Sequence, residues 1–263
     1  MIVRKNQPEL EKMRAAGLLV YKVLSTLKSM VAEGVSTYDL EVAAEKMITE
    51  GGARPAFKGY PNPAAGSKFP FVLCVSVNDE IVHGMPSQKK ILKSGDIVSI
   101  DTGVQLNGYY GDSAITVPVG EISEEAQRLI DVTRESLELA IDKMRPGNRL
   151  FDVCGTVERH VTANGFSVVR EFVGHGIGTQ MHEEPQVPNY GSPGQGPRLQ
   201  EGMVIAIEPM VNTGGPGVRV LDDDWTAVTA DGSDSAHFEH TVAVTSKGPW
   251  ILTRPKEATG PCW

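Results

Sequence analysis

Apolar residues recur every three or four positions near the start of the chain, a spacing that predicts an amphipathic helix beginning near Pro8. The positions that carry this pattern are Leu10, Met13, Val20, Leu24 and Leu27. A second helix is predicted by Ser36-Thr-Tyr-Asp39, which has the form of a capping box, and Gly51-Gly52 should end it. The first part of the chain therefore contributes one helix pair.

A second pair is predicted after residue 120. Ser123-Glu-Glu-Ala is a helix start, and that helix should run to about Met144, where Pro146-Gly147 stops it. The next helix is expected from Leu150 to Ala163, before Asn164-Gly165.

Strands are predicted where short stretches are rich in Val, Ile or Thr. These stretches are Phe71–Val77, Asp96–Thr102, Ser113–Val119, Ser167–Arg170, Met203–Ile207 and Thr241–Thr245. In each half of the chain, strands follow helices. The sequence thus predicts an α+β protein.

Two of these strands carry a faint internal repeat. The segment 95–101, GDIVSID, matches the segment 202–208, GMVIAIE, and both end in an acid. Downstream, Asp112 precedes SAITV and Glu239 precedes HTVAV, so each half has an acid that ends one strand and an acid that opens another. We expect a single domain of two pseudo-symmetric halves, about 1–120 and 121–263. One antiparallel sheet would bring the four acids to its centre, with the helix pairs on its other face.

The amino-acid composition argues against several classes of function. The 263 residues are 40% hydrophobic, which is typical of a globular chain, and the net charge of −8 argues against general affinity for nucleic acid or anionic lipid. No apolar run approaches the length of a membrane span, and the N-terminus has no secretory h-region. Three cysteines, Cys74, Cys154 and Cys262, show no CxxC spacing. A cytoplasmic protein is expected.

The four acids indicate a metal centre. Asp101 and Glu208 each close an apolar strand, where a buried charge is costly unless it is paired or binds a cation. Ion pairing to Lys or Arg is the alternative, but no basic residue stands near Asp112, Glu208 or Glu239 in the sequence. Four carboxylates would balance two divalent ions.

The segment VGHGIGTQMHEEP, residues 173–185, supplies the candidate nitrogen ligand. A surface turn is the plain alternative for it. Glycines on both sides of His175 allow close backbone approach, so His175 is the expected ligand. Oxygen ligands with one imidazole favour Mn, Fe, Co or Zn over copper, and two such ions can activate a bridging water and polarise the carbonyl that it attacks. Amide hydrolysis is the predicted reaction.

Two further histidines are candidates for contact with a substrate. His182 stands seven residues after His175 and is free to donate to a substrate carbonyl or a developing oxyanion. His83 lies in the short turn IVHGMP and could contact the substrate or the leaving group; an ordinary loop histidine is the alternative. His160, His237 and His240 are expected to be structural or to lie behind the ligands.

Five segments together, VGHGIGTQMHEEP, IVHGMP, SIDTGVQLNGYYGD, VIAIEPMV and HFEHTVAV, closely resemble the motifs of type I methionine aminopeptidases, enzymes of the M24 peptidase type. The resemblance spans nearly the whole chain and implies the pita-bread fold and removal of the initiator methionine from new polypeptides. It implies the dinuclear ligand set Asp101, Asp112, His175, Glu208 and Glu239. It also implies substrate contact by His83 and His182 and proton transfer by Glu208. A monomer is the family expectation.

The resemblance implies a methionine side-chain pocket around Phe57, Tyr60, Cys74 and Trp225, where sulfur–aromatic contacts suit a thioether. Core packing is the alternative for these residues. Met181 replaces an aromatic residue found in many bacterial members, and the Pro61–Phe71 loop is longer than usual. A monovalent cation site would map near Asn78 and Ser235.

Two other functions remain open. Prolidases and proline-specific aminopeptidases share this fold and metal set, although they resemble chains with an added N-terminal domain. Some pita-bread proteins are non-catalytic binding modules, and these typically lack part of the ligand set.

Overall fold

Four helices form the two predicted pairs in the computed structural model, which describes residues 2–62, 66–256 and 258. The helices are α1 (Gln7–Met30), α2 (Thr37–Glu50), α3 (Glu124–Ile141) and α4 (Leu150–Ala163). The predicted capping box is present at the start of α2, where Ser36 and Asp39 exchange side-chain to backbone hydrogen bonds. Helix α3 starts after its predicted cap Ser123 but ends at Ile141, so Met144 lies in the turn that follows.

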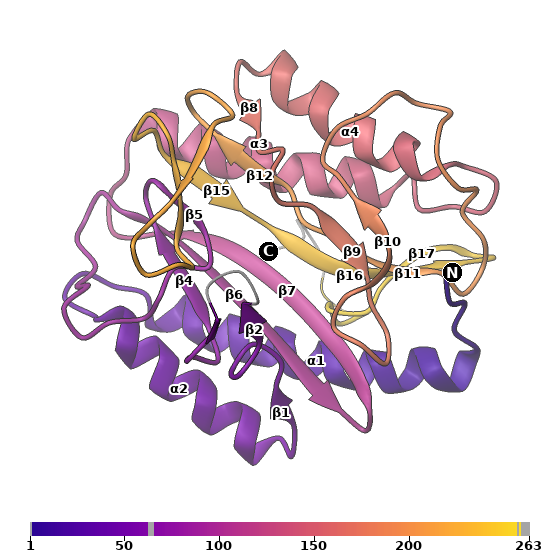
Figure 1. Cartoon of the computed structure of the whole chain (residues 1–263), viewed down its shortest axis with the longest axis horizontal. Coiled ribbons are helices and arrows are strands. Elements are labelled where there is room, and N and C mark those ends of the chain that lie inside the picture. The colour runs from indigo at the N-terminus through magenta and orange to yellow at the C-terminus, as the bar shows by residue number, and fades with distance from the viewer. Residues whose placement is uncertain (1, 63–65, 257, 259–263) are drawn as a thin grey trace.

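A nine-stranded antiparallel sheet spans both halves of the chain, with α1 and α2 beside one part of it and α3 and α4 beside the other (Figure 1). Its main path has the order β1-β6-β7-β16-β11-β9-β10, while β4 pairs with β6 and β17 pairs with β16. The bounds of these strands are β1 (Arg54–Pro55), β4 (Cys74–Val77), β6 (Ile97–Leu106), β7 (Tyr109–Pro118), β9 (Gly174–Gly176), β10 (Glu183–Val187), β11 (Val204–Ile207), β16 (Glu239–Thr245) and β17 (Gly248–Ile251). Strands from both halves of the chain therefore meet at β7 and β16.

Smaller sheets complete the fold. They contain β2 (Pro61–Asn62) with β3 (Ser67–Lys68), β5 (Glu80–Val82) with β13 (Val218–Val220) and β14 (Ala227–Thr229), and β8 (Ser167–Val168) with β12 (Met210–Asn212) and β15 (Ser235–His237). These short strands were not predicted, except for β8, because two or three residues carry too little periodicity. The predicted strand Phe71–Val77 begins only at Cys74, and Ser167–Arg170 is cut to two residues.

The prediction that Asp101 ends a strand and Asp112 opens one was wrong. Both acids lie inside the long hairpin of β6 and β7, where Gly103 pairs with Asp112 and Asp101 pairs with Ala114. The polar stretch after Asp101 suggested a strand end, but ladder hydrogen bonds are made by the backbone and do not require apolar side chains. The strands reverse only at Asn107-Gly108, where both residues have positive φ angles of 52° and 80°.

Side chains alternate between the two faces of β6, so one set packs into the core and the other lines the cavity described below. Ile100 and Val104 belong to the core cluster that includes Val20 and Leu24 of α1, whereas Asp101 lines the cavity. Helix α1 packs directly on β6 and β7, and α3 packs on α4 and against the second half's strands. The helices thus cover one face of the sheet, as predicted. None of the helices in the described ranges has the length and apolarity needed to cross a bilayer.

Candidate metal centre

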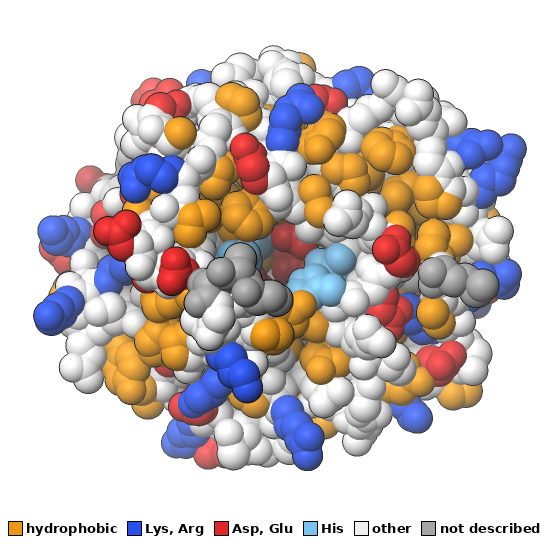
Figure 2. Space-filling view, viewed as in Figure 1, with side chains coloured by type: hydrophobic (Ala, Val, Ile, Leu, Met, Phe, Trp, Pro, Cys, Tyr) orange, Lys and Arg blue, Asp and Glu red, His pale blue; other side chains and the backbone are white. Residues whose placement is uncertain are grey.

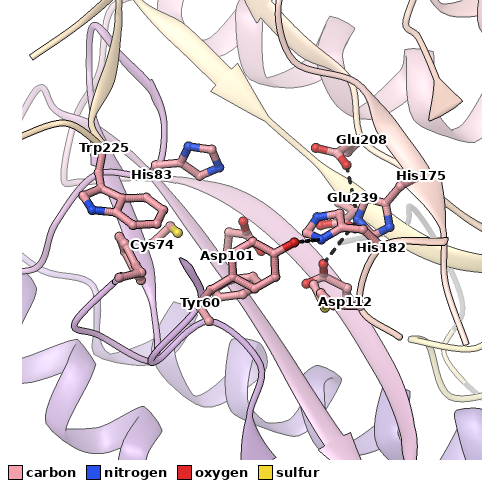
Figure 3. Close-up of a pocket in the computed structure, with 13 residues that line it drawn as sticks. Tyr60, Cys74, His83, Asp101, Asp112, His175, His182, Glu208, Trp225 and Glu239 are labelled. Carbon is pink, nitrogen blue, oxygen red and sulfur yellow. Dashed lines mark hydrogen bonds and ion pairs between the residues drawn. The ribbon is translucent and has the colours of Figure 1, made fainter. Parts of the chain in front are cut away.

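Five neighbouring strands bring the predicted ligands to one cavity. Asp101 lies on β6, Asp112 on β7, Glu239 at the start of β16, Glu208 directly after β11, and His175 on β9. Ala114 of β7 pairs with Asp101 on one side and with Glu239 on the other, so these two acids stand in one row across the sheet. Asp112 is two residues from Ala114 and therefore projects from the same face. Figure 3 shows the five side chains converging.

The distances are those of a ligand cluster. Asp112, His175 and Glu239 each offer a ligand atom, and these atoms all lie within 4.8 Å of one another. The His175 Nε2 atom lies 3.9 Å from Asp112 Oδ2 and 3.7 Å from Glu208 Oε1. Asp101 and Glu208 are outside the tight group of three but line the same cavity, which has a volume of about 340 Å³. The space-filling view shows acidic and histidine side chains at the bottom of its opening (Figure 2).

The electrostatics of this cavity favour a cation. No Lys or Arg is among the described residues that line it, so the alternative of ion pairing to a basic side chain is not supported. Burial raises the pKa of Asp112 to about 7, and burial together with the charge of Asp112 raises the pKa values of Asp101, Glu208 and Glu239 well above the ordinary range. Without a compensating charge, these carboxyls hold protons at a pH where isolated carboxyls have lost them.

Unsatisfied oxygen atoms point to the same conclusion. Asp101 Oδ1, Asp112 Oδ1 and Glu239 Oε1 are buried and accept no hydrogen bond from any described residue. Buried carboxylate oxygens normally have partners, and a divalent ion would satisfy these. Oxygens with one imidazole suit Mn, Fe, Co or Zn, so the residues present fit the metal centre that the sequence predicts.

His175 is held in the form that a ligand requires. Its Nδ1 atom lies 2.9 Å from the carbonyl oxygen of Gly176, which can only accept, so Nδ1 carries the proton and the Nε2 lone pair faces the acids. Burial, with a contribution from His182, lowers the pKa of His175 to about 3 and keeps the ring neutral. A Cβ atom on Gly174 would lie 2.4 Å from the carbonyl oxygen of Ala206, and one on Gly176 would lie 2.1 Å from that of Glu184. The flanking glycines thus permit the close strand pairing that the sequence suggested.

His182 and His83 both reach the cavity. The His182 ring centroid is 4.2 Å from that of His175, and Tyr60 Oη lies 2.7 Å from His182 Nδ1. His83 has a positive φ of 60° and stands edge-on to Phe172 and Trp225. Burial lowers the pKa of both rings, that of His83 to about 4, with His182 contributing to the shift. Both rings are therefore neutral hydrogen-bonding groups near pH 7.

An apolar wall adjoins the acids. It contains the four residues predicted for the side-chain pocket, Phe57, Tyr60, Cys74 and Trp225, and it also contains Phe69 and Met181. Sequence reasoning missed Phe69, which lies in a loop and packs edge-on against Trp225 at 5.1 Å between ring centroids. An aromatic residue in a loop rich in Pro and Gly was its only signal. Burial, with a contribution from Asp101, raises the pKa of Cys74 well above its ordinary value, so this thiol is not an activated nucleophile.

Other predicted positions also have clear places in the fold. His237 Nε2 lies 3.8 Å from Glu208 Oε2, behind the proposed ligands, as expected. Asn78 and Ser235 are neighbours, because the Ser235 N–H donates to the Asn78 carbonyl oxygen at 2.9 Å. Cys74 and Cys154 are buried free thiols, and Cys262 lies outside the described residues.

Comparison with known proteins agrees with this geometry. Residues 11–246 match the model of metallopeptidase family M24. The methionine aminopeptidase of Clostridium perfringens is 53% identical over 96% of this chain and 99% of its own length, and methionine aminopeptidase 1 of Bacillus subtilis is 51% identical over 97% and 100%. The crystal structure of the Thermotoga maritima methionine aminopeptidase superposes with a TM-score of 0.93 at 47% identity, covering 97% of this chain and 100% of that one. The Pyrococcus furiosus prolidase shares the fold, with a TM-score of 0.77 at 23% identity, and 66% of its length is covered.

Proposed function

This chain belongs to metallopeptidase family M24 and has its pita-bread fold, and from this premise we propose that it hydrolyses the first peptide bond of polypeptides that begin with methionine. It is an enzyme of the methionine aminopeptidase type. One observation carries the proposal: the predicted acids and His175 meet on adjacent strands, directly beside an apolar pocket rich in aromatic rings. A metal centre beside such a pocket suits a substrate with a thioether side chain next to its scissile bond.

The proposed ligands are Asp101, Asp112, His175, Glu208 and Glu239. Their four carboxylates carry the charge that balances two divalent ions, and buried oxygens of three of them have no hydrogen-bond partner among the described residues. When bound, such ions lower the pKa of water and polarise a carbonyl group. Asp112, His175 and Glu239 would hold one ion together, while Glu208, 3.7 Å from His175, and Asp101 line the same cavity and complete the ligand set.

The chain's own residues bind the substrate and move its protons. The methionine side chain enters the wall of Phe57, Phe69 and Trp225, which excludes water from it. His182 donates a hydrogen bond to the carbonyl oxygen under attack, and His83 contacts the peptide nitrogen that leaves.

Glu208 serves as the proton carrier in addition to its place among the ligands. It accepts a proton from the attacking water and delivers it to the departing nitrogen, so the C–N bond breaks while the water oxygen joins the methionine carboxyl group. Glu208 lines the cavity, and its Oε2 atom lies 3.8 Å from Nε2 of His237 behind it. The products are free methionine and a polypeptide with a new N-terminal amine.

Several finer points complete the proposal. The substrates are the N-termini of newly made polypeptides, and the reaction takes place in the cytoplasm. The halves 1–120 and 121–263 act as one catalytic domain, and the enzyme works as a monomer. A monovalent cation binds near Asn78 and Ser235, which is supported by the direct contact between these two residues. The net charge of −8 gives no support for nucleic acid or membrane partners.

The two rival functions have less support. The likeness to prolidases, at 23% identity, concerns the fold alone, whereas the relatives at 51% and 53% identity are methionine aminopeptidases over their full length. A non-catalytic binding module is disfavoured because all five proposed ligands and both accessory histidines line one cavity.

The test is release of the first residue from Met-Ala-Ser and from Ala-Pro-Ser, each with chelator and with added Mn, Fe or Co. Metal-dependent cleavage of Met-Ala-Ser alone is expected. Cleavage of Ala-Pro-Ser alone would move the assignment to the proline-specific enzymes. No turnover of either peptide with any of the metals would favour the binding module.

A further inference from the structure

The turn that connects β9 to β10 presents two side chains to the cavity. Met181 and His182 both line it, directly before β10 begins at Glu183. The turn has few backbone bonds of its own: the Gly178 N–H donates to the Gln180 carbonyl oxygen at 3.1 Å, and the Tyr110 N–H donates to the Gly178 carbonyl oxygen at 2.9 Å. Its conformation therefore depends on other contacts.

The carboxylate of Glu183 closes this turn. Its Oε1 atom accepts the backbone N–H groups of Thr179 at 2.8 Å and Gln180 at 3.2 Å. Its Oε2 atom accepts the ammonium of Lys5 at 2.7 Å. Burial alone would raise the pKa of Glu183, but Lys5 and the two N–H groups hold the pKa below its ordinary value, so the group is an anion at neutral pH.

Lys5 is as firmly fixed as its partner. The Lys5 side chain is 3% exposed and that of Glu183 is 10% exposed, whereas both side chains of the Lys58–Glu45 pair are nearly half exposed. The backbone N–H of Lys5 donates to the Gly202 carbonyl oxygen at 2.7 Å, and a Cβ atom on Gly202 would lie 2.5 Å from the Lys5 carbonyl oxygen. The lysine reaches the turn from a segment that is packed against the second half of the chain.

Space for this pair is made by a glycine of the turn itself. A Cβ atom on Gly178 would lie 2.5 Å from both Lys5 Cε and Glu183 Oε1. The ammonium thus lies directly against the turn, where its position determines how the following residues are held. His182 is then fixed from two sides, by the turn and by Tyr60.

We propose that Lys5 and Glu183 are positioning residues, whose buried ion pair holds the 177–182 turn so that His182 and Met181 meet the substrate. The segment before α1 thereby contributes to the active site, although none of the described residues that line the cavity belongs to this segment. This inference rests on the proposed function for its effect on turnover. Its effect on the turn can be measured without any substrate.

The first experiment compares wild type, Lys5→Met, Glu183→Gln and the double variant on Met-Ala-Ser with saturating Mn. Lys5→Met should lower kcat about tenfold or more, because small displacements of a group that acts in the transition state are costly. Bound Mn should stay at the wild-type amount, because β9 holds His175 through its pairing with β11. The double variant should regain part of the lost kcat, since a neutral amide in place of the Glu183 carboxylate no longer leaves a buried charge unpaired.

The second experiment measures hydrogen exchange at the amides of Thr179 and Gln180 in the metal-loaded proteins. Exchange should be about tenfold faster in Lys5→Met, since the acceptor of both amides is no longer fixed. Arg134→Met serves as the control, because it removes a partly buried ion pair with Asp131 on α3, away from the cavity. The control should leave kcat and both exchange rates unchanged.

Unchanged kcat together with unchanged exchange in Lys5→Met would overturn the proposal. An equal loss of kcat in Arg134→Met would also overturn it, and so would a loss of bound Mn in Lys5→Met. If Lys5→Met fails to fold, Glu183→Gln is judged by the same two measurements. Wild-type protein that cleaves neither peptide would refute the proposed function, while the exchange rates would still decide whether the ion pair holds the turn.

Discussion

The buried acids predict an unusual dependence of stability on pH when no metal is bound. Raised pKa values in the folded state mean that folding takes up protons at Asp101, Asp112, Glu208 and Glu239. Their contribution to stability is complete below the pKa of the unfolded carboxyls, near 4, and it is lost as the pH rises through the folded values, of which that of Asp112 is about 7. The metal-stripped protein should therefore become less stable above neutral pH.

Buried histidines also contribute to the dependence of stability on pH. The pKa values of His83, His175 and His237 are lowered to about 4, 3 and 3, so their contribution to stability is lost as the pH falls through the unfolded value near 6.5. These histidines gain their protons in the unfolded chain whether or not metal is bound to the folded protein, so a comparison of the metal-stripped and metal-loaded proteins isolates the acids. Asp112, with a folded pKa of about 7, loses most of its proton between pH 6.5 and pH 8.5, which lowers the free energy of unfolding by about 1 kcal/mol.

Urea unfolding at pH 6.5 and pH 8.5 measures this effect, with chelator in one series and saturating Mn in the other. Relative to the Mn-loaded protein, the metal-stripped protein should lose at least about 1 kcal/mol of unfolding free energy at the higher pH. The Mn-loaded protein should lose far less, because the bound ions replace the protons. Asp101→Asn should flatten the slope of the metal-stripped protein. Equal changes of unfolding free energy in both series would refute the assignment of these acids as ligands.

Four further substitutions test the site and the fold. His175→Ala should lose bound metal, whereas His182→Ala should retain it and lower kcat about a hundredfold; equal metal loss in a metal titration would contradict these roles. Trp225→Ala should raise the KM for Met-Ala-Ser about tenfold with a smaller change in kcat, since it removes apolar contact with the methionine side chain; steady-state kinetics with an unchanged KM would exclude Trp225 from the pocket. Gly17→Ala places a Cβ atom 2.4 Å from the Leu252 carbonyl oxygen and should lower the free energy of unfolding by about 2 kcal/mol at unchanged metal content; an unaltered urea midpoint would show that α1 shifts freely.

Much of this fold was predictable from local signals. Helices α2 and α3 begin after capping residues that the sequence shows, Ser36 with Asp39 and Ser123 before its acids. The acids were predictable for a different reason: Asp101 and Glu239 border apolar runs, where a charge without a partner is costly. Short strands and hairpin limits were not predictable, because backbone pairing continued through polar residues up to Asn107-Gly108.

The residues that were missed act through long-range contact. Phe69 reaches the pocket from a loop, and its partner Trp225 is far away in the sequence, so no periodic pattern connects them. The ion pair of Lys5 and Glu183 spans 178 positions of sequence. Each of these residues is ordinary in its own segment, and its role depends on which strands the fold places side by side.

The cavity also explains why function and stability are opposed at this site. A metallopeptidase needs its carboxylates charged and close together, which is the arrangement that burial penalises most. The long hairpin of β6 and β7 keeps Asp101 and Asp112 on neighbouring strands despite this penalty, because its backbone ladder does not depend on their charge. The folded chain thus holds the acids close together before metal binds, and divalent ions offset the repulsion between the acids on binding. Metal affinity in this protein therefore depends on that hairpin as well as on the ligand atoms.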